Sequence, residues 1–282
     1  HVLDDNLRLY AGQMKVPFGL SELTSEALRE FGLPASTLQF GLGRDRGARI
    51  DYTADLGGAR LDVKAGVFNG EGQNVVNNID DTWLWAGWAE FSPMGKVSAG
   101  EPDLKNSPLR VAVGASAAYT KHIARKELGL GDTGAKELRY SGHLKLKARG
   151  FALRGEYIGS SVEGDATGAD FGRQAYSAQA GYVLPLGWKV KLQPVVRVTQ
   201  WDVNDEQDGY VVQPSGGKKY QVPDNSDRRE IDLGLTAYFN DHHFKLNIMY
   251  RLTDFLEGPK TDPDGNPLIG DSVFTYLQFG WL

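Results

Sequence analysis

The sequence predicts an all-β protein, specifically a transmembrane antiparallel up-and-down β-barrel, and three observations carry this prediction. Apolar and polar residues alternate with a period of two along most of the 282-residue chain. Most of the alternating segments are roughly 10–13 residues long, which matches the ~9–11 residues that a tilted strand needs to cross a bilayer. Short links alternate with long ones, as in outer-membrane barrels with short turns at one end and long loops at the other. We therefore expect one barrel domain over residues 1–282.

Twelve strands can be assigned in chain order from the alternation and from the turn residues that bound it. The short turns are Gly57-Gly58, Arg149-Gly150, Pro185-Leu186-Gly187 and Asn240-Asp241. The link at 93–108 combines a tight turn at its start with an irregular stretch. The long links are 17–45, 70–81, 122–137, 162–172, 202–227 and 254–271. The predicted strands are 6–16, 46–56, 59–69, 82–92, 109–121, 138–149, 151–161, 173–184, 188–201, 228–239, 242–253 and 272–282.

The composition excludes several other classes of protein. The chain has no cysteine, which removes disulfide scaffolds and thiolate metal sites. Its net charge of −5 argues against a nucleic-acid partner. No apolar run approaches the ~20 residues that a membrane helix needs. The histidines stand in no catalytic or metal-binding spacing, so we expect neither an enzyme activity nor a cofactor. The alternative fold is a water-soluble β-sandwich with one buried face.

The alternation also assigns the two faces of the strands. Apolar side chains such as Leu144 and Leu246 share one face, which we expect to contact lipid. The other face would line the interior, and there basic residues outnumber acidic ones by about two to one, which favours small anions because a low-dielectric wall focuses the field. The inward basic residues are Arg8, Arg49, Arg60, Lys64, Arg110, Arg139, Lys145, Lys147, Arg149, Arg154, Lys189, Lys191, Arg197, Lys245 and Arg251. The inward acidic residues are Asp51, Asp55, Asp62, Glu90, Glu156, Glu230 and Asp232.

Four blocks in the N-terminal quarter carry a family resemblance. They are Gly12-Gln13-Met14-Lys15-Val16-Pro17-Phe18-Gly19-Leu20, Leu23-Thr24-Ser25, Gly43-Arg44-Asp45-Arg46-Gly47-Ala48-Arg49 and Ala65-Gly66-Val67-Phe68-Asn69-Gly70. In order and spacing these blocks resemble the phosphate-selective porin O and P family. The resemblance implies a sixteen-stranded trimeric barrel, so we expect an N-terminal portion to precede this sequence. The outward pattern of the last strand also predicts that the native chain continues beyond Leu282 with an aromatic residue.

The resemblance further implies that the segment after the first block enters the pore and narrows it. This constricting loop is expected at 17–45, with a helical stretch from Glu22 to Phe31. Its candidate constriction residues are Arg29, Arg44 and Arg46.

The leading hypothesis is a porin of the bacterial outer membrane that admits small anions, such as phosphate or other oxyanions, by passive diffusion. Its expected partners are outer-membrane lipid and lipopolysaccharide, small anions, and two further copies of itself in a homotrimer, with no nucleic acid. One alternative is a general or carbohydrate-preferring porin of the same fold. Another is a structural or adhesive outer-membrane barrel that binds an envelope partner.

Overall fold

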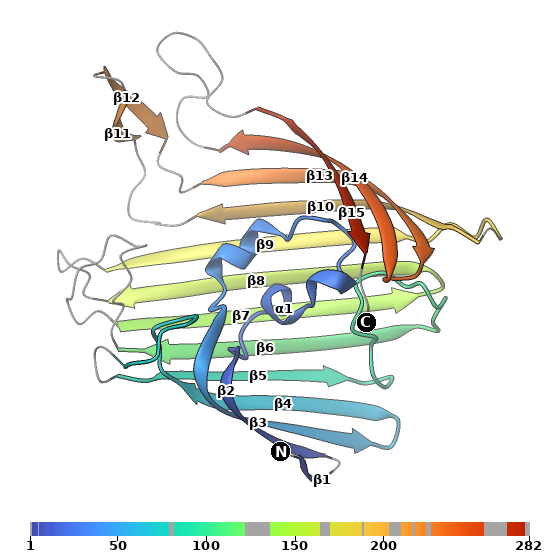
Figure 1. Ribbon diagram of the computed structural model, residues 1–282, viewed down its shortest axis with the longest axis horizontal. Coiled ribbons are helices and arrows are strands. Elements are labelled where there is room, and N and C mark those ends of the chain that lie inside the picture. Colours follow the sequence, from blue (N-terminus) through green and yellow to red (C-terminus); the bar gives the residue numbers. More distant parts are fainter. Residues whose placement is uncertain are drawn as a thin grey trace.

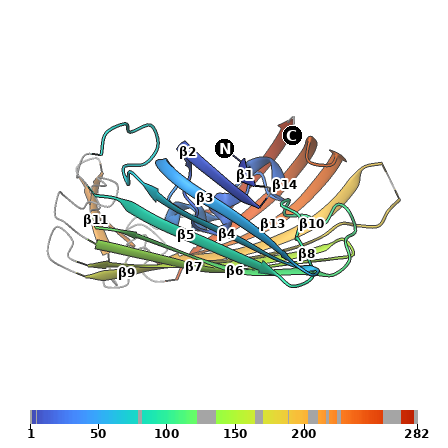
Figure 2. The same cartoon turned by 90° about the horizontal axis from the view of Figure 1, so that it is seen from below.

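The strands form one large antiparallel sheet in which each strand pairs with its neighbours along the chain. A computed structural model describes residues 2–4, 6–78, 82–121, 136–163, 170–187, 189–202, 210–215, 218–223, 227–256 and 270–279. Within these residues the sheet has thirteen strands, and a separate hairpin has two. Viewed from below, the sheet curves into a trough whose two rims carry the first and last strands (Figure 2).

All twelve predicted strands are confirmed, with bounds close to those expected, and their up-and-down order is also as predicted. They are β2 (Leu7–Lys15), β3 (Arg44–Leu56), β4 (Ala59–Phe68), β5 (Leu84–Ser92), β6 (Arg110–Thr120), β7 (Lys136–Ala148), β8 (Phe151–Glu163), β9 (Phe171–Tyr182), β10 (Lys191–Asp202), β13 (Arg228–Asn240), β14 (Phe244–Phe255) and β15 (Ser272–Phe279). The expected end of the last strand, at 280–282, lies outside the described residues.

Three further strands were not predicted. A short strand, β1 (Val2–Asp4), pairs with β2 at one edge of the sheet. The other two, β11 (Tyr210–Ser215) and β12 (Lys218–Pro223), pair with each other inside the link that was expected to be a plain loop. The sequence does contain a signal for this hairpin, because the glycine pair at 216–217 separates two runs with valine and tyrosine.

The strands present different side chains on their two faces. On β7, Leu138, Tyr140 and Leu144 are exposed, whereas the intervening Arg139 and His143 are buried. Such alternation is expected where one face packs against protein and the other faces the surroundings. Among the described residues, no helix combines the length and the apolar character that crossing a membrane requires.

The connection between β2 and β3 folds back over the concave face of the sheet, where Figure 1 shows it in front of the central strands. We call residues 16–43 the inner loop. The expected helix from Glu22 to Phe31 is wrong: the loop contains α1 (Leu20–Leu23) and two 3₁₀ turns, η1 (Glu26–Leu28) and η2 (Ser36–Phe40). The helix ends because the backbone becomes extended at Thr24 and Ser25.

Two apolar clusters hold the inner loop against the sheet. In the larger cluster, Phe18 and Phe40 of the loop pack with wall residues that include Phe68, Leu84 and Trp201. The smaller cluster is Phe31 of the loop with Val195 and Met249 of the wall, and Leu33 and Phe274 pack beside it. Gly234 makes room for this second contact, because a Cβ at that position would lie 2.6 Å from the Phe31 ring. The loop is therefore part of the protein core.

Candidate functional site

Three buried cations of the sheet donate hydrogen bonds to backbone carbonyls of the inner loop. Lys245 contacts the carbonyls of Ala27, at 3.2 Å, and of Arg29. Arg197 bonds the carbonyls of Leu33 at 3.1 Å and Pro34 at 3.2 Å. Arg139 bonds those of Phe40 at 3.0 Å and Gly41 at 3.1 Å. Because little of the loop is helical, these carbonyls lack helical partners, and the wall cations supply the donors that buried backbone requires.

The beginning of the inner loop is held by groups of β6 and β8. The backbone N–H of Gly19 donates to Ser116 Oγ at 3.0 Å. Glu156 accepts hydrogen bonds from the backbone N–H and the hydroxyl of Ser21, at 3.1 and 2.5 Å, and from the N–H of Leu20. Gly19 has φ of 71°, a left-handed conformation that glycine adopts without strain. The inner loop is thus attached to the wall at its start, middle and end.

A second insertion reaches the interior from the opposite end of the sheet. We call the connection between β5 and β6, residues 93–109, the second insert. Lys147 of β7 holds this insert against the sheet: its ammonium donates to Ser98 Oγ at 2.7 Å and to the carbonyls of Pro102, at 2.9 Å, and Gly100. The tight turn expected at the start of this link is present, with the Gly95 N–H donating to the Ser92 carbonyl at 3.2 Å, and the irregular stretch that follows contacts the interior.

The inner loop and the second insert meet at two glutamates. Glu101 accepts a hydrogen bond from the Glu30 backbone N–H at 2.8 Å, and its own N–H donates to the Leu28 carbonyl at 2.8 Å. Gln179 of β9 bridges the two carboxylates, at 2.6 Å from Glu30 and 2.9 Å from Glu101. Gln193 also donates to Glu30, and Arg154 pairs with Glu101.

The environments of the two glutamates shift their pKa values in opposite directions. Burial, with the neighbouring charge of Glu101, raises the pKa of Glu30 to about 7. Burial also opposes ionisation of Glu101, but Arg154 and the donated hydrogen bonds outweigh it and leave the pKa of Glu101 below its ordinary value.

Most of the predicted pore-lining cations are paired with carboxylates. The ion pairs include Arg49 with Asp51 at 2.6 Å, Arg60 with Asp62 at 2.7 Å, Arg139 with Glu137 at 2.8 Å, Lys145 with Glu90 at 2.7 Å, Arg154 with Glu101, Lys191 with Asp241 at 2.7 Å, Arg197 with Asp232 at 2.6 Å and Arg251 with Asp232 at 2.7 Å. Their positive charge is therefore largely balanced locally.

Three of the predicted residues lie at or beyond the ends of strands. Arg110 is the first residue of β6 and approaches Gly95 of the second insert. Arg149 is exposed in the tight turn between β7 and β8, with φ of 48°, and so lies outside the strand in which it was expected. Lys189 is exposed before β10 begins.

The candidate constriction residues lie on different parts of the structure. Arg29 is buried in the inner loop, where its carbonyl meets Lys245. Arg44 and Arg46 belong to β3, and strand alternation puts them on the same face as the exposed Ile50 and Tyr52. Among the described residues no hydrogen bond or ion pair joins Arg29 to either of them, but Arg29 and Arg44 both interact electrostatically with Lys15 and Glu22.

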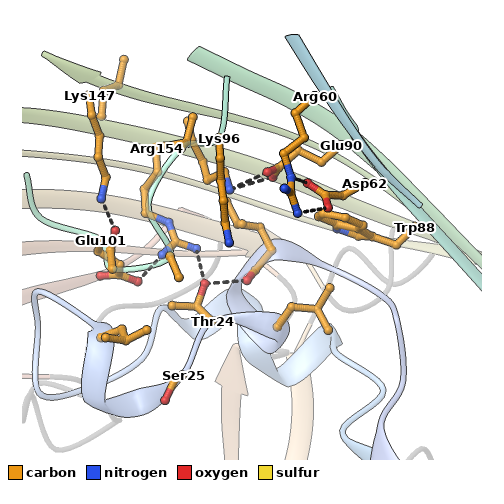
Figure 3. A pocket seen from close by; sticks show the side chains of 18 of the residues that line it. Thr24, Ser25, Arg60, Asp62, Trp88, Glu90, Lys96, Glu101, Lys147 and Arg154 are labelled. Carbon is orange, nitrogen blue, oxygen red and sulfur yellow. Dashed lines mark hydrogen bonds and ion pairs between the residues drawn. The ribbon is translucent and has the colours of Figure 1, made fainter. Parts of the chain in front are cut away.

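A cavity of about 330 Å³ lies between α1, the second insert and the concave face of the sheet. Figure 3 shows the charged side chains of the sheet on one side and Thr24 and Ser25 of the inner loop on the other. Its charged lining consists of Arg60, Lys64, Lys96, Lys145, Lys147, Arg154, Asp62, Glu90 and Glu101. Six of these nine side chains are basic and three are acidic, so the cavity carries an excess of positive charge.

Sequence reasoning did not single out several residues of this interior. Lys96 and Glu101 were overlooked because they lie in the link expected to be irregular. Trp88 lines the cavity, and Lys64 lies over its ring at 4.8 Å from the centroid. Arg173 is buried and pairs with Glu137. The alternation along β9 could have identified it, because Arg173 occupies the same face of the strand as the buried Ala175 and Gln179.

Comparison with known proteins identifies the family of the chain. The family model of phosphate-selective porin O and P matches residues 2–254. The chain belongs to this porin family, and membership points to a channel of the outer membrane. It is also similar to a solved structure described as "TodX monoaromatic hydrocarbon channel deltaS2 mutant", with 11% identity, 98% of this chain and 79% of that chain covered, and a TM-score of 0.34. No curated protein matches the chain.

Proposed function

We propose that the protein is a bacterial outer-membrane porin through which small anions, including phosphate or other oxyanions, diffuse passively. Family membership supports the channel, and the sheet has the apolar outer face and charged inner face that a water-filled barrel needs. In this proposal the sheet closes into a barrel that contacts lipid and lipopolysaccharide and assembles as a homotrimer. The sixteen strands implied by the family resemblance remain a prediction.

The positive cavity is the observation that carries the proposed preference for anions. Arg60, Lys145 and Arg154 have carboxylate partners, and Lys147 is held by Ser98 and backbone carbonyls. The contacts described for the chain contain no ion pair for Lys64 or Lys96. Both ammonium groups line the cavity without a described carboxylate in ion-pair contact, and the carboxylates of Asp51, Asp62 and Glu90 act on Lys64 only from longer range. Cations without such a contact on a pore wall favour anions over cations.

The inner loop is the proposed constriction. The loop crosses the concave face of the sheet, and the second insert meets it from the other end, so the two together narrow any path through the interior. Arg29 lies within this region, and Arg44, at the loop's end on β3, interacts electrostatically with Lys15 and Glu22, as Arg29 does. Arg46 is kept in the proposed constriction as the next residue but one along β3. The proposed constriction keeps the range 17–45.

The reversal potential of the purified protein in planar bilayers tests the anion preference. Under a tenfold gradient of KCl, we expect a reversal potential of the sign that chloride permeation gives. Lys96→Glu should reduce this potential, because it replaces an exposed cation of the cavity by an anion. Lys105→Glu is the matched control, since Lys105 is an exposed residue of the same insert outside the cavity lining. Cation preference in the unmodified protein would refute the proposed selectivity.

A general or carbohydrate-preferring porin is the second candidate, and the pairing of the interior supports it. Most wall cations have a carboxylate within 4 Å, which weakens the field that an anion would feel. Equal permeation of potassium and chloride, with current reduced by added sugars, would favour this candidate. A complete lack of conductance would instead favour the structural or adhesive barrel.

A further inference from the structure

The cavity beside α1 has two chemically different walls. Its loop side presents Leu20, Leu23 and Leu28 of the inner loop and Val97 of the second insert, together with the polar Thr24, Ser25, Lys96 and Glu101. Its sheet side presents the charged residues of β4, β5, β7 and β8. Because the two inserts are fixed to each other and to the sheet, the apolar side chains are held opposite the charged ones.

Lys64 and Lys96, the two cations without an ion pair among the described contacts, both line this cavity. Lys64 lies over the face of Trp88, and Trp88 is stacked on His143 with ring centroids 5.7 Å apart. The indole therefore has a fixed position and a broad apolar surface next to an ammonium group. Lys96 adds a second ammonium from the second insert. Asp62, Glu90 and Glu101 are the carboxylates of this lining, and each is paired with an arginine or lysine.

An inorganic oxyanion matches only half of this lining. It would bind the ammonium groups but leave the leucines and the indole in contact with water, without the gain that burying apolar surface provides. A neutral apolar solute would match the other half and leave the cations without a counter-ion. A carboxylate attached to a small apolar body matches both walls, because its oxygens accept charge-assisted hydrogen bonds from lysine.

The size of the cavity limits that apolar body. A volume of about 330 Å³ is at the lower end of the range for small-molecule sites, which runs from about 300 to 1,000 Å³. Such a space accommodates one aromatic ring or a short alkyl chain with its carboxylate.

We propose that this cavity is a binding subsite for small carboxylic acids with an apolar body, with Lys64 and Lys96 holding the carboxylate and Trp88 and the inner-loop leucines holding the body. The inference rests on the proposed function, since it names the class of anion that would bind in the pore while it diffuses through the channel. It also predicts that charge alone does not determine which anions bind.

Benzoate, acetate, inorganic phosphate and benzyl alcohol are the four probes that separate these contributions. We expect benzoate to reduce the chloride current through the unmodified protein in planar bilayers at a concentration at least tenfold lower than acetate or phosphate. Benzyl alcohol, which has the ring without the charge, should have no comparable effect. Calorimetric titration of the detergent-solubilised protein with benzoate gives a second measure of binding that needs no conductance.

Three variants test the assigned residues. Lys64→Gln and Lys96→Gln should each weaken benzoate binding about tenfold, and Leu23→Gln should reduce the preference for benzoate over acetate. Lys105→Gln is the matched control and should bind benzoate as the unmodified protein does. Because Lys96 is exposed, its variant tests the site even if Lys64→Gln fails to fold.

The outcomes distinguish the subsite from the proposed pore. An anion-selective channel that binds benzoate no better than acetate or phosphate would overturn the subsite and leave the proposed function intact. Benzoate binding that is unchanged in both Lys64→Gln and Lys96→Gln would also overturn it. A cation-selective channel, in contrast, would refute the proposed function itself.

Discussion

Inside this protein, individual cations are used to satisfy backbone carbonyls as well as carboxylates. The buried Lys245 donates to main-chain carbonyls of the inner loop. The buried Arg139 donates both to a main-chain carbonyl of the loop and to the carboxylate of Glu137. Arg197 combines the two uses, because it contacts two carbonyls and the buried carboxylate of Asp232. Removing such a side chain would leave several polar groups without partners, which costs more than the net value of one hydrogen bond.

Glu30 makes the stability of the folded protein depend on pH. The pKa of Glu30 is raised to about 7 in the folded protein and is near 4.5 in an unfolded chain. The folded state therefore binds a proton more readily than the unfolded state between these two values. The contribution of Glu30 to stability is fully present below about pH 4.5 and is lost as the pH rises to about 7.

Glu101 has a lowered pKa, so its own contribution to stability is lost only when the pH falls below the ordinary pKa of a glutamate. The charged or titratable groups around Glu30 are Glu101, Arg154, Lys147, Lys245 and Tyr238.

We predict that Glu30→Gln removes much of this pH dependence. The apparent melting temperature of the unmodified protein in detergent, followed by circular dichroism, should fall between pH 5 and pH 8. The variant should show a smaller fall, because its amide does not ionise. Glu26→Gln is the control, since Glu26 is exposed in the same loop. An equally large fall in Glu30→Gln would show that another group is responsible.

At the scale of elements, the pairing of β2 with β3 does not depend on the inner loop that connects them. Lys15 and Arg44, the residues that flank the loop, are direct partners in the β2–β3 register. A two-residue turn can therefore replace residues 16–43 and still close the hairpin.

We predict that replacing residues 16–43 by Asn-Gly increases the single-channel conductance at least about twofold, because the loop then no longer narrows the water-filled path. Planar-bilayer recordings measure this directly. A deletion of Gly72–Val76 in the exposed connection between β4 and β5 serves as the control and should leave the conductance unchanged. If the loop-deleted protein inserts and conducts as before, the inner loop is not the constriction.

The sequence predicts the strands well and the inner loop poorly, for physical reasons that particular residues illustrate. Alternation along β7 is a local pattern, so it identifies the strand and the faces of Leu144 and Lys145 without knowledge of the rest of the chain. The contacts of the loop are not local: Arg29 meets Lys245, more than two hundred residues away. A helix was expected from Glu22 to Phe31, but Glu30 instead accepts hydrogen bonds from Gln179 and Gln193. Tertiary hydrogen bonds override local helical preference here.

At the scale of the whole molecule, the two faces of the sheet separate two environments. Charged and hydrogen-bonded side chains fill the concave side, whereas the convex side carries large exposed apolar residues from one edge of the sheet to the other. These include Leu9, Ile50, Val113, Tyr140, Leu144, Tyr157, Val196, Leu235, Ile248 and Leu277. So large an apolar surface is not stable in water and is what a lipid-facing wall requires.

The apolar convex face makes a quantitative prediction about position. Leu235 is 47% exposed near the middle of β13, where the wall would lie deepest in the hydrocarbon. Leu235→Arg should therefore reduce the free energy of unfolding by about 2–4 kcal/mol, whereas an arginine near the membrane interface costs only about 0–1 kcal/mol. Leu56→Arg is the matched control, because Leu56 is similarly exposed but lies at the end of β3 beside the turn. Urea unfolding of the protein in lipid vesicles, followed by tryptophan fluorescence, measures both values. Equal small losses in the two variants would mean that the middle of β13 does not contact hydrocarbon, since only a depth-dependent cost distinguishes a bilayer from a detergent-like or aqueous surface.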